Sequence, residues 1–286
     1  MQWIRHRKCG ATRSVALAVA STSLLTLLAT SALAQGLSNV DLCNGRDRSS
    51  PEPQITGCTE LIKAGVDNPR ILAIAYNNRG DAYTGKGDYD LAIQDFDEAL
   101  KLNPNYAKSF NNRGVAYQKK GDYDRAIQDF TAAINIDPNY ANAFANRAET
   151  YEKKNDYGNA LNDLNEALRI QPDLRLVWND RCWTRAVLGD LQPALADCNQ
   201  AIHLDPNSAS ALDSRGLTYL KSGQWGLAIT DYNSALKIDP KLPTSLYGRG
   251  YAKLKTGDRA GGSADIAAAV ALEQNIAGDF LRYGLQ

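Results

Sequence analysis

The chain has 286 residues, with 32 basic and 32 acidic side chains, 44% apolar residues, five Cys and two His. Formal neutrality argues against a nucleic-acid coat or a polybasic membrane binder, because the affinity of both depends on clustered Lys and Arg. Two His also leave little material for metal binding or acid–base catalysis.

Residues 1–34 have the layout of a secretory signal peptide. Four basic side chains and no acidic one precede an apolar run from Val15 to Ala34, which ends in the small-x-small form that signal peptidases cut. We expect cleavage after Ala34 and a periplasmic or secreted protein, and removal of the four basic residues leaves a net charge of −4. An uncleaved membrane anchor is the alternative, because about 20 apolar residues can span a bilayer.

Residues 35–72 are predicted to form an incomplete helix hairpin, because their sequence resembles a later part of the chain. The segment around Cys43 (DLCNG) matches the segment around Cys182 (DRCWT), and the segment around Cys58 aligns with the one around Cys198. The two Cys are 15 residues apart in the first hairpin and 16 apart in the second.

Residues 73–276 form six consecutive units of 34 residues, in which positions are counted from the first residue of each unit. An Arg at position 7, an Ala at position 27 and, in five units, a Pro at position 32 recur with this period. A large residue at position 4 and a small one at position 8 share one face of a first helix, because residues four apart are neighbours on a helix. A Gly-Asp pair or near equivalent then breaks the chain, and a second helix follows.

At these positions the chain resembles the tetratricopeptide repeat family, whose 34-residue pattern has an aromatic residue, Gly, Tyr, Ala, Phe, Ala and Pro at the same places. The resemblance covers 204 residues. It implies an all-α fold, a right-handed superhelix (α-solenoid) of antiparallel helix pairs. Residues 277–286 are expected to form a C-terminal cap, since Ile276, Phe280 and Tyr283 recur at helical spacing.

Every unit also has an Asp at position 23, sixteen residues after its Arg. We expect the two side chains to form a partly buried, bidentate ion pair at the seam between the two helices. An arginine row for an anionic ligand is the alternative. The six predicted pairs are Arg79–Asp95, Arg113–Asp129, Arg147–Asp163, Arg181–Asp197, Arg215–Asp231 and Arg249–Asp265.

Four Cys remain after the signal peptide, in a compartment where thiols oxidise. Positions 8 and 24 of a helix hairpin face each other closely enough for a disulfide. Of the three possible pairings, Cys43–Cys58 and Cys182–Cys198 are therefore favoured. The alternative is that all four are small buried thiols. A redox role is not indicated, because the chain has no C-x-x-C motif.

No catalytic residue, metal ligand or cofactor site is predicted. His203 is the only His beyond the signal peptide, and it lies late in a second helix, where side chains usually face solvent. The chain has no G-x-S-x-G, H-E-x-x-H or phosphate-loop motif and no zinc-type Cys/His spacing. We therefore expect neither an enzyme nor a cofactor.

The family resemblance implies that the first helices line a concave groove that takes a peptide or protein segment. Positions 9 and 12 predict a groove that is polar and acidic in units one to three and apolar in units four to six, with Lys221 and Lys255 at its edge. Exposed aromatic and Leu side chains in a concavity are typical anchors for a partner, although they can instead pack against neighbouring first helices. The residues expected in the groove are Asn77, Asn78, Asn111, Asn112, Trp183, Leu217, Leu220, Tyr247, Tyr251 and Leu254.

We therefore expect an exported scaffold for protein–protein interactions. Its partner is an unidentified protein or extended peptide and not a nucleic acid, and no membrane insertion is expected after signal cleavage. The N-R-G and G-D-Y-D segments resemble exported members of the family in Gram-negative bacteria, which implies a role in envelope complex assembly or secretion. The alternative is a small-ligand or glycan-binding module that uses the row Trp183, Leu217 and Tyr251.

Overall fold

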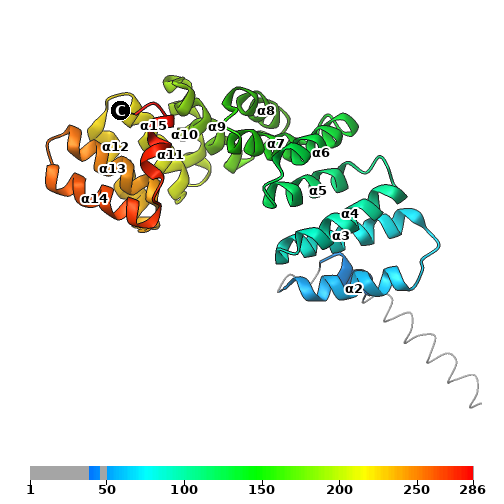
Figure 1. Cartoon of the computed structure of the whole chain (residues 1–286). Helices are drawn as coiled ribbons and strands as arrows, with labels where there is room; N and C mark the ends of the chain where they lie inside the picture. Colours follow the sequence, from blue (N-terminus) through cyan, green and yellow to red (C-terminus); the bar gives the residue numbers. More distant parts are fainter. Residues whose placement is uncertain (1–38, 46–49, 286) are drawn as a thin grey trace, which may run out of the picture. The chain divides into compact units, whose positions relative to one another are not determined.

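The computed structural model describes residues 39–45 and 50–285, and all regular elements within those ranges are helices (Figure 1). The prediction of an all-α fold built from helix pairs is confirmed. The chain divides into two compact units, unit 1 (residues 1–103) and unit 2 (residues 104–286), and each is described by itself. They are distinct from the six 34-residue repeat units, which are numbered in words from one to six. The predicted signal peptide lies outside the described residues. Among those residues, no helix is long and apolar enough to cross a membrane.

Unit 1 begins with a disulfide-linked hairpin. A short helical segment at residues 39–43 packs on the next helix, and Cys43 is bonded to Cys58 with a Cα–Cα distance of 4.5 Å. The following helix begins at Pro69, ahead of the expected repeat border at residue 73, because the Asn68 side chain accepts hydrogen bonds from two backbone N–H groups of its first turn. The helices of unit 1 are α2 (Pro51–Lys63), α3 (Pro69–Lys86) and α4 (Tyr89–Leu102).

Unit 2 consists of five helix pairs and a short C-terminal helix, α15 (Ile276–Arg282). The first helices of successive pairs contact one another, and each second helix contacts the first helix of the next pair. The first helices therefore share one face of unit 2. The pairs are α5 (Ala107–Lys119) with α6 (Tyr123–Ile136), α7 (Ala141–Lys153) with α8 (Tyr157–Ile170), α9 (Arg175–Leu188) with α10 (Leu191–Leu204), α11 (Ala209–Lys221) with α12 (Trp225–Ile238), and α13 (Pro243–Lys255) with α14 (Arg259–Leu272).

The turn inside a pair needs one residue in the left-handed region of backbone space. Gly189, after α9, has φ of 88° and ends that helix with backbone hydrogen bonds to its last turn. Glycine suits this position because it has no Cβ to clash. Asn155 occupies the same place between α7 and α8 with φ of 59°, and Asn is the side chain that tolerates this region best after Gly.

Within each pair, position 8 of the first helix faces position 24 of the second, and their sizes are complementary. A Cβ added to Gly114 would lie 2.7 Å from the Phe130 ring, and one added to Gly216 would lie 2.8 Å from the Tyr232 ring. In the α9–α10 pair these two positions are instead Cys182 and Cys198, which are disulfide-bonded with a Cα–Cα distance of 5.2 Å. The disulfide thus takes the place of the glycine–aromatic contact.

The six predicted Arg–Asp pairs are all present and bidentate. In each, the Arg Nε and Nη2 atoms donate to the two carboxylate oxygens at 2.7–2.8 Å. The Asp side chains are nearly buried, so their charge requires this neutralisation. The Nη1 atom of Arg147 reaches Thr131 on the preceding second helix at 2.8 Å, and Nη1 of Arg215 reaches Asn199 at 2.8 Å. Each such Arg therefore joins its own pair to the preceding one.

Candidate functional site

Polar side chains connect neighbouring first helices at several points of their shared face. Gln118 on α5 donates to the Thr150 hydroxyl on α7 at 3.1 Å. Asn146 on α7 donates to Asn111 on α5 at 2.9 Å. The same type of contact recurs between α9 and α11, where the hydroxyl of a Ser donates to an Asn amide oxygen at 2.9 Å. These hydrogen bonds satisfy buried polar groups and hold the first helices in register.

Four of the predicted groove residues are buried and do not face a partner. Asn77 is fully buried and donates to its neighbour Asn78, while Asn111 accepts the hydrogen bond described above. Leu217 and Leu220 belong to the core of the last helix pairs, together with residues of α15. The prediction that these four side chains are available to a partner is wrong, because each is buried within its own unit.

The aromatic groove residues are half-buried, and α15 lies against them. The rings of Tyr157 and Tyr283 contact the Trp183 ring edge-on, with centroids at 5.6 and 5.4 Å. Tyr247 packs on Phe280 of α15 at 4.5 Å. The C-terminal segment was expected to cover the last core edge. It contacts α13 and α14, and it also reaches Trp183 on α9.

The remaining predicted groove residues lie outside this aromatic cluster. Tyr251 is half-buried, with Trp225 at 6.4 Å between centroids and the Lys255 ammonium 4.9 Å from its ring centre. Leu254 is exposed. Asn78 in unit 1 and Asn112 in unit 2 are half-buried, and Asn78 donates to Asn44 at 3.4 Å.

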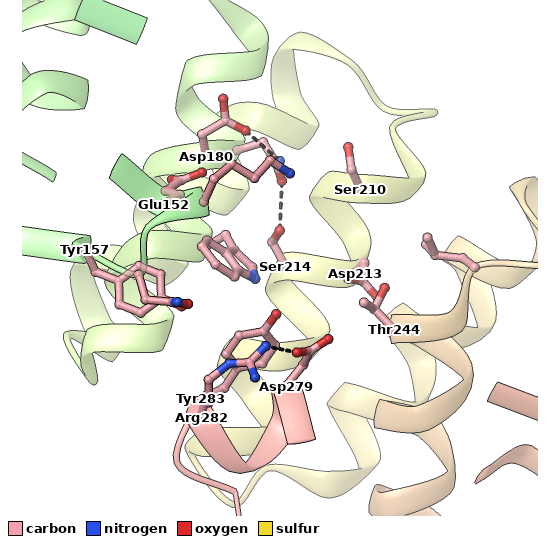
Figure 2. A pocket seen from close by; sticks show the side chains of 15 residues that line it. Glu152, Tyr157, Asp180, Ser210, Asp213, Ser214, Thr244, Asp279, Arg282 and Tyr283 are labelled. Carbon is pink, nitrogen blue, oxygen red and sulfur yellow. Dashed lines mark hydrogen bonds and ion pairs between the residues drawn. The ribbon is translucent and has the colours of Figure 1, made fainter. Parts of the chain in front are cut away.

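A pocket of about 500 Å³ opens on the first-helix face of unit 2 (Figure 2). Its walls come from the α7–α8 turn, from α9 and α11, from the start of α13 and from α15. Figure 2 shows acidic and aromatic side chains turned toward its interior. The side chains that define it here are Glu152, Tyr157, Asp180, Trp183, Asp213, Asp279, Arg282 and Tyr283.

Three carboxylates of this pocket have raised pKa values. Burial raises the pKa of Glu152 to about 8. A hydrogen bond from the Thr184 hydroxyl lowers this pKa in part, and the nearby Asp180 charge raises it further. Burial likewise raises the pKa of Asp180 and of Asp213 to about 6, and these two accept hydrogen bonds from Asn179 and from Ser245, respectively. Asp279, in contrast, is paired with Arg282 on its own helix. The pocket therefore holds three carboxylates whose hydrogen-bond donors are neutral, with Lys153 acting on Glu152 only through its charge.

Asp180, Asp213, Tyr157 and Tyr283 were not predicted as groove residues. The groove was expected to be apolar in the 34-residue repeat units four to six. Two of the three carboxylates nevertheless lie there, Asp180 in repeat unit four and Asp213 in repeat unit five. Position 5 holds Asn in units one, two and four but Asp213 in unit five, and that difference is the signal in the sequence. The sequence gives no such signal for the place of Tyr283 in the pocket, because that place depends on how α15 packs on the preceding helices.

The His and Cys side chains of the described residues are placed apart from the pocket. Within the described ranges, no group of three or more His, Cys, Asp or Glu side chains could hold a metal ion. His203 is exposed on α10, and all four described Cys are in disulfides.

Comparison with known proteins identifies the repeat. The family model described as TPR repeat matches residues 80–121 and 216–257, and models described as tetratricopeptide repeat match residues 107–140 and 141–174. The sequence is 41% identical over 51 residues to the Drosophila melanogaster "DNA polymerase interacting tetratricopeptide repeat-containing, protein of 47 kDa", a match that covers 18% of this chain and only 13% of that protein.

Many solved structures share the fold, among them two TPR proteins. One is YrrB, described as a TPR protein with an unusual peptide-binding site, which is 22% identical, has a TM-score of 0.56 and covers 67% of this chain and 97% of its own. The other is PilW, described as a widely conserved type IV pilus biogenesis factor, which is 19% identical, has a TM-score of 0.63 and covers 70% of this chain and 93% of its own.

Proposed function

Because the chain belongs to the tetratricopeptide repeat family, we propose that it is an exported, non-catalytic scaffold that binds a segment of a partner protein on the first-helix face of unit 2. The pocket between α7 and α15 supports this proposal, since it combines a concave shape with an aromatic anchor, Trp183, and with carboxylates that form no ion pair among the described residues. Such pockets concentrate the binding energy of protein interfaces in a few residues.

The proposal places the protein in the periplasm or outside the cell, in envelope assembly or secretion. The layout of residues 1–34 supports export, and two cysteine pairs positioned as disulfides suit an oxidising compartment. The shared fold with PilW is compatible with a role in assembly. Mass spectrometry of the protein from its native cell is expected to find an N-terminus at Gln35, and a mature chain that begins at Met1 in the cytoplasm would contradict export.

The glycan alternative is less favoured by the geometry. A sugar platform needs a continuous aromatic face, but Leu217 lies buried between Trp183 and Tyr251 along the row. In addition, both contacts to the Trp183 ring come from other rings of the same chain. A peptide that inserts single side chains is a better match to separated anchors.

Pull-down from a native periplasmic extract tests the scaffold proposal. Trp183→Ala is expected to lose a specific protein partner that the wild type retains, because it removes the central anchor of the pocket. Leu227→Ala, an exposed apolar residue on α12, is the matched control and should retain the partner. Equal recovery of all proteins by wild type and Trp183→Ala would contradict the proposal, provided that circular dichroism shows both variants to be folded.

A further inference from the structure

The three pocket carboxylates differ from the other buried acids of the chain. Each buried Asp at position 23 is neutralised by a bidentate Arg. No Lys, Arg or His among the described residues forms an ion pair with Glu152, Asp180 or Asp213, whose hydrogen-bond donors are hydroxyl and amide groups. The structural acids are thus each paired with an Arg, whereas the three pocket acids form no ion pair within the described part of the chain, although Lys153 and Arg282 line the same pocket and the Lys153 charge opposes the effect of burial on the pKa of Glu152.

This arrangement has an energetic cost that a bound cation removes. A carboxylate taken out of water without a counter-charge is destabilised in its ionised form, which is why burial raises the pKa of all three groups. An external ammonium or guanidinium group in the pocket would restore the favourable interaction with the ionised carboxylate. The pocket is thus charge-complementary to a positively charged ligand.

The positions of the three carboxylates favour an extended ligand over a single ion. Glu152 lies on α7, Asp180 on α9 and Asp213 on α11, so they follow three successive first helices. Among the described residues, no three acidic groups are close enough to hold one metal ion. Cationic groups that are spaced along a chain can reach these carboxylates separately, and a single ion cannot.

The aromatic side chains of the pocket match the same ligand. Tyr157, Trp183 and Tyr283 line the cavity together with the acids (Figure 2). Aromatic faces attract guanidinium and ammonium groups and pack against their aliphatic stems. The chain itself places a guanidinium here, because Arg282 of α15 lines the pocket. Burial raises the pKa of the Tyr157 hydroxyl, and the Arg282 charge opposes that shift.

We propose that the pocket binds an extended basic peptide, whose Arg or Lys side chains pair with Asp213, Asp180 and Glu152 while an adjacent aromatic or apolar residue packs on Trp183. The inference rests on the proposed function and specifies the chemistry of the partner segment. Binding buries the pocket acids against cations, so the acidic side chains determine selectivity and the aromatic ones add contact area.

Binding is expected to strengthen as the pH rises. The cation binds the ionised carboxyl, and the free carboxyls bind protons below pKa values of about 6 for Asp180 and Asp213 and about 8 for Glu152. Affinity should therefore fall about tenfold or more between pH 8 and pH 5, with uptake of protons. The other groups that face these acids are Glu149 and Lys153 of α7, Asn179 and Thr184 of α9, Tyr232 of α12, and Thr244 and Ser245 of α13. Asp279 and Arg282 of α15 and the following Tyr283 line the same pocket.

Fluorescence anisotropy on the full chain tests the inference. The probe is a short fluorescein-labelled peptide of alternating Arg and Tyr, and its partner probe has citrulline, a neutral isostere, at every Arg position. The arginine peptide should bind at least about tenfold more tightly than the citrulline peptide at pH 8. The double variant Asp180→Asn/Asp213→Asn should reduce that ratio toward one, because Asn keeps the hydrogen-bonding shape and removes the charge.

The matched control is Glu98→Gln/Glu166→Gln, which removes two exposed acids from second helices and should leave the ratio unchanged. Equal binding of the two peptides by the wild type, or no binding of the arginine peptide, overturns the inference. A loss of discrimination in the control as large as in the pocket variant also overturns it, since the effect is then one of net charge. Displacement of the arginine peptide by spermidine at equal charge concentration would assign the site to free polyamines instead.

This experiment separates the inference from the proposed function. If the two peptides bind alike while Trp183→Ala still loses its native partner, the scaffold stands and cation selectivity fails. If Trp183→Ala loses nothing from the extract, the scaffold proposal fails, whatever the peptides show.

Discussion

Two residue-level devices repeat along the chain and explain most of its packing. A small residue at position 8 admits a large one at position 24, as in Gly114 with Phe130. An Arg at position 7 neutralises the buried Asp at position 23, as in Arg147 with Asp163. Both act across the seam of one helix pair, because the two helices approach most closely there. Each therefore fixes the pairing of a first helix with the second helix that follows it.

The size complementarity at the seam predicts opposite effects for the same substitution at two glycines. Gly114→Ala should destabilise the fold by about 1–3 kcal/mol, because the new Cβ would lie 2.7 Å from the Phe130 ring. Gly158→Ala, on α8 with nothing within 4 Å of the new Cβ, should stabilise it by about 0.5–1 kcal/mol through helix propensity. Urea unfolding followed by circular dichroism measures both.

A second substitution should rescue the first. Unit three carries Ala148 and Leu164 at positions 8 and 24, and both belong to one buried cluster. Phe130→Leu in the Gly114→Ala background should therefore recover part of the lost stability. Additive losses in the double variant would show that the two positions do not compete for the same space.

The ion pair at the seam predicts a large loss when only its cation is removed. Arg147→Leu should cost about 3–5 kcal/mol, because Asp163 is left buried without a counter-charge. Arg169→Leu, which breaks an exposed pair with Glu166, should change the free energy of unfolding by less than about 1 kcal/mol. An unchanged melting temperature for Arg147→Leu would reject a structural role for the pair.

At the scale of elements, α15 has a role that no repeat helix has. It carries Ile276 and Phe280 into the core of the last pairs and sets Tyr283 against Trp183 of α9. The same seven-residue helix thus closes the apolar end and forms one wall of the candidate pocket.

A buried and an exposed side chain of α15 should respond differently to replacement by Ala. Phe280→Ala removes the ring that packs on Tyr247 and should cost about 3–5 kcal/mol of local stability. Leu281→Ala alters an exposed neighbour on the same helix and should have little effect. Hydrogen exchange of residues 276–285, followed by mass spectrometry, should accelerate in Phe280→Ala alone. Equal exchange rates in both variants would show that α15 is not held through Phe280.

At the scale of the whole molecule, pH should affect stability through the pocket acids. Burial raises the folded-state pKa of Glu152 to about 8 from its ordinary value of 4.5, so the folded protein holds a proton that the unfolded chain releases. Stability from this group is full below about pH 4.5 and is lost progressively as the pH rises toward 8. A bound cation reverses this loss, which couples folding stability to binding.

Glu152→Gln should therefore be more stable than the wild type at alkaline pH. The difference should be near zero at pH 4 and about 1–3 kcal/mol at pH 8.5, after allowance for partial contact of the side chain with solvent. Thermal melts of both proteins across this range measure it. Glu166→Gln, on the exposed face of α8, should show no such trend, and a difference for Glu152→Gln that is constant with pH would contradict the linkage.

The sequence by itself determined the repeat, its helix pairs and the residues that meet across each seam. Those contacts are local, since positions 7 and 23, like positions 8 and 24, are 16 residues apart in one hairpin. The pattern recurs in six repeat units, so each unit supports the same prediction of contact. The Arg–Asp pairs and the pairing of Cys182 with Cys198 were therefore predictable from spacing.

Only the tertiary structure decided which first-helix residues remain accessible. Leu217, Leu220, Asn77 and Asn111 carry groove positions in the repeat but are buried, because accessibility depends on the neighbouring helices and on what covers them. The pocket likewise combines Glu152, Asp180 and Asp213 from three helices with a wall from α15. No periodic signal encodes that combination, since its members occupy different repeat positions and meet only when the helices stack.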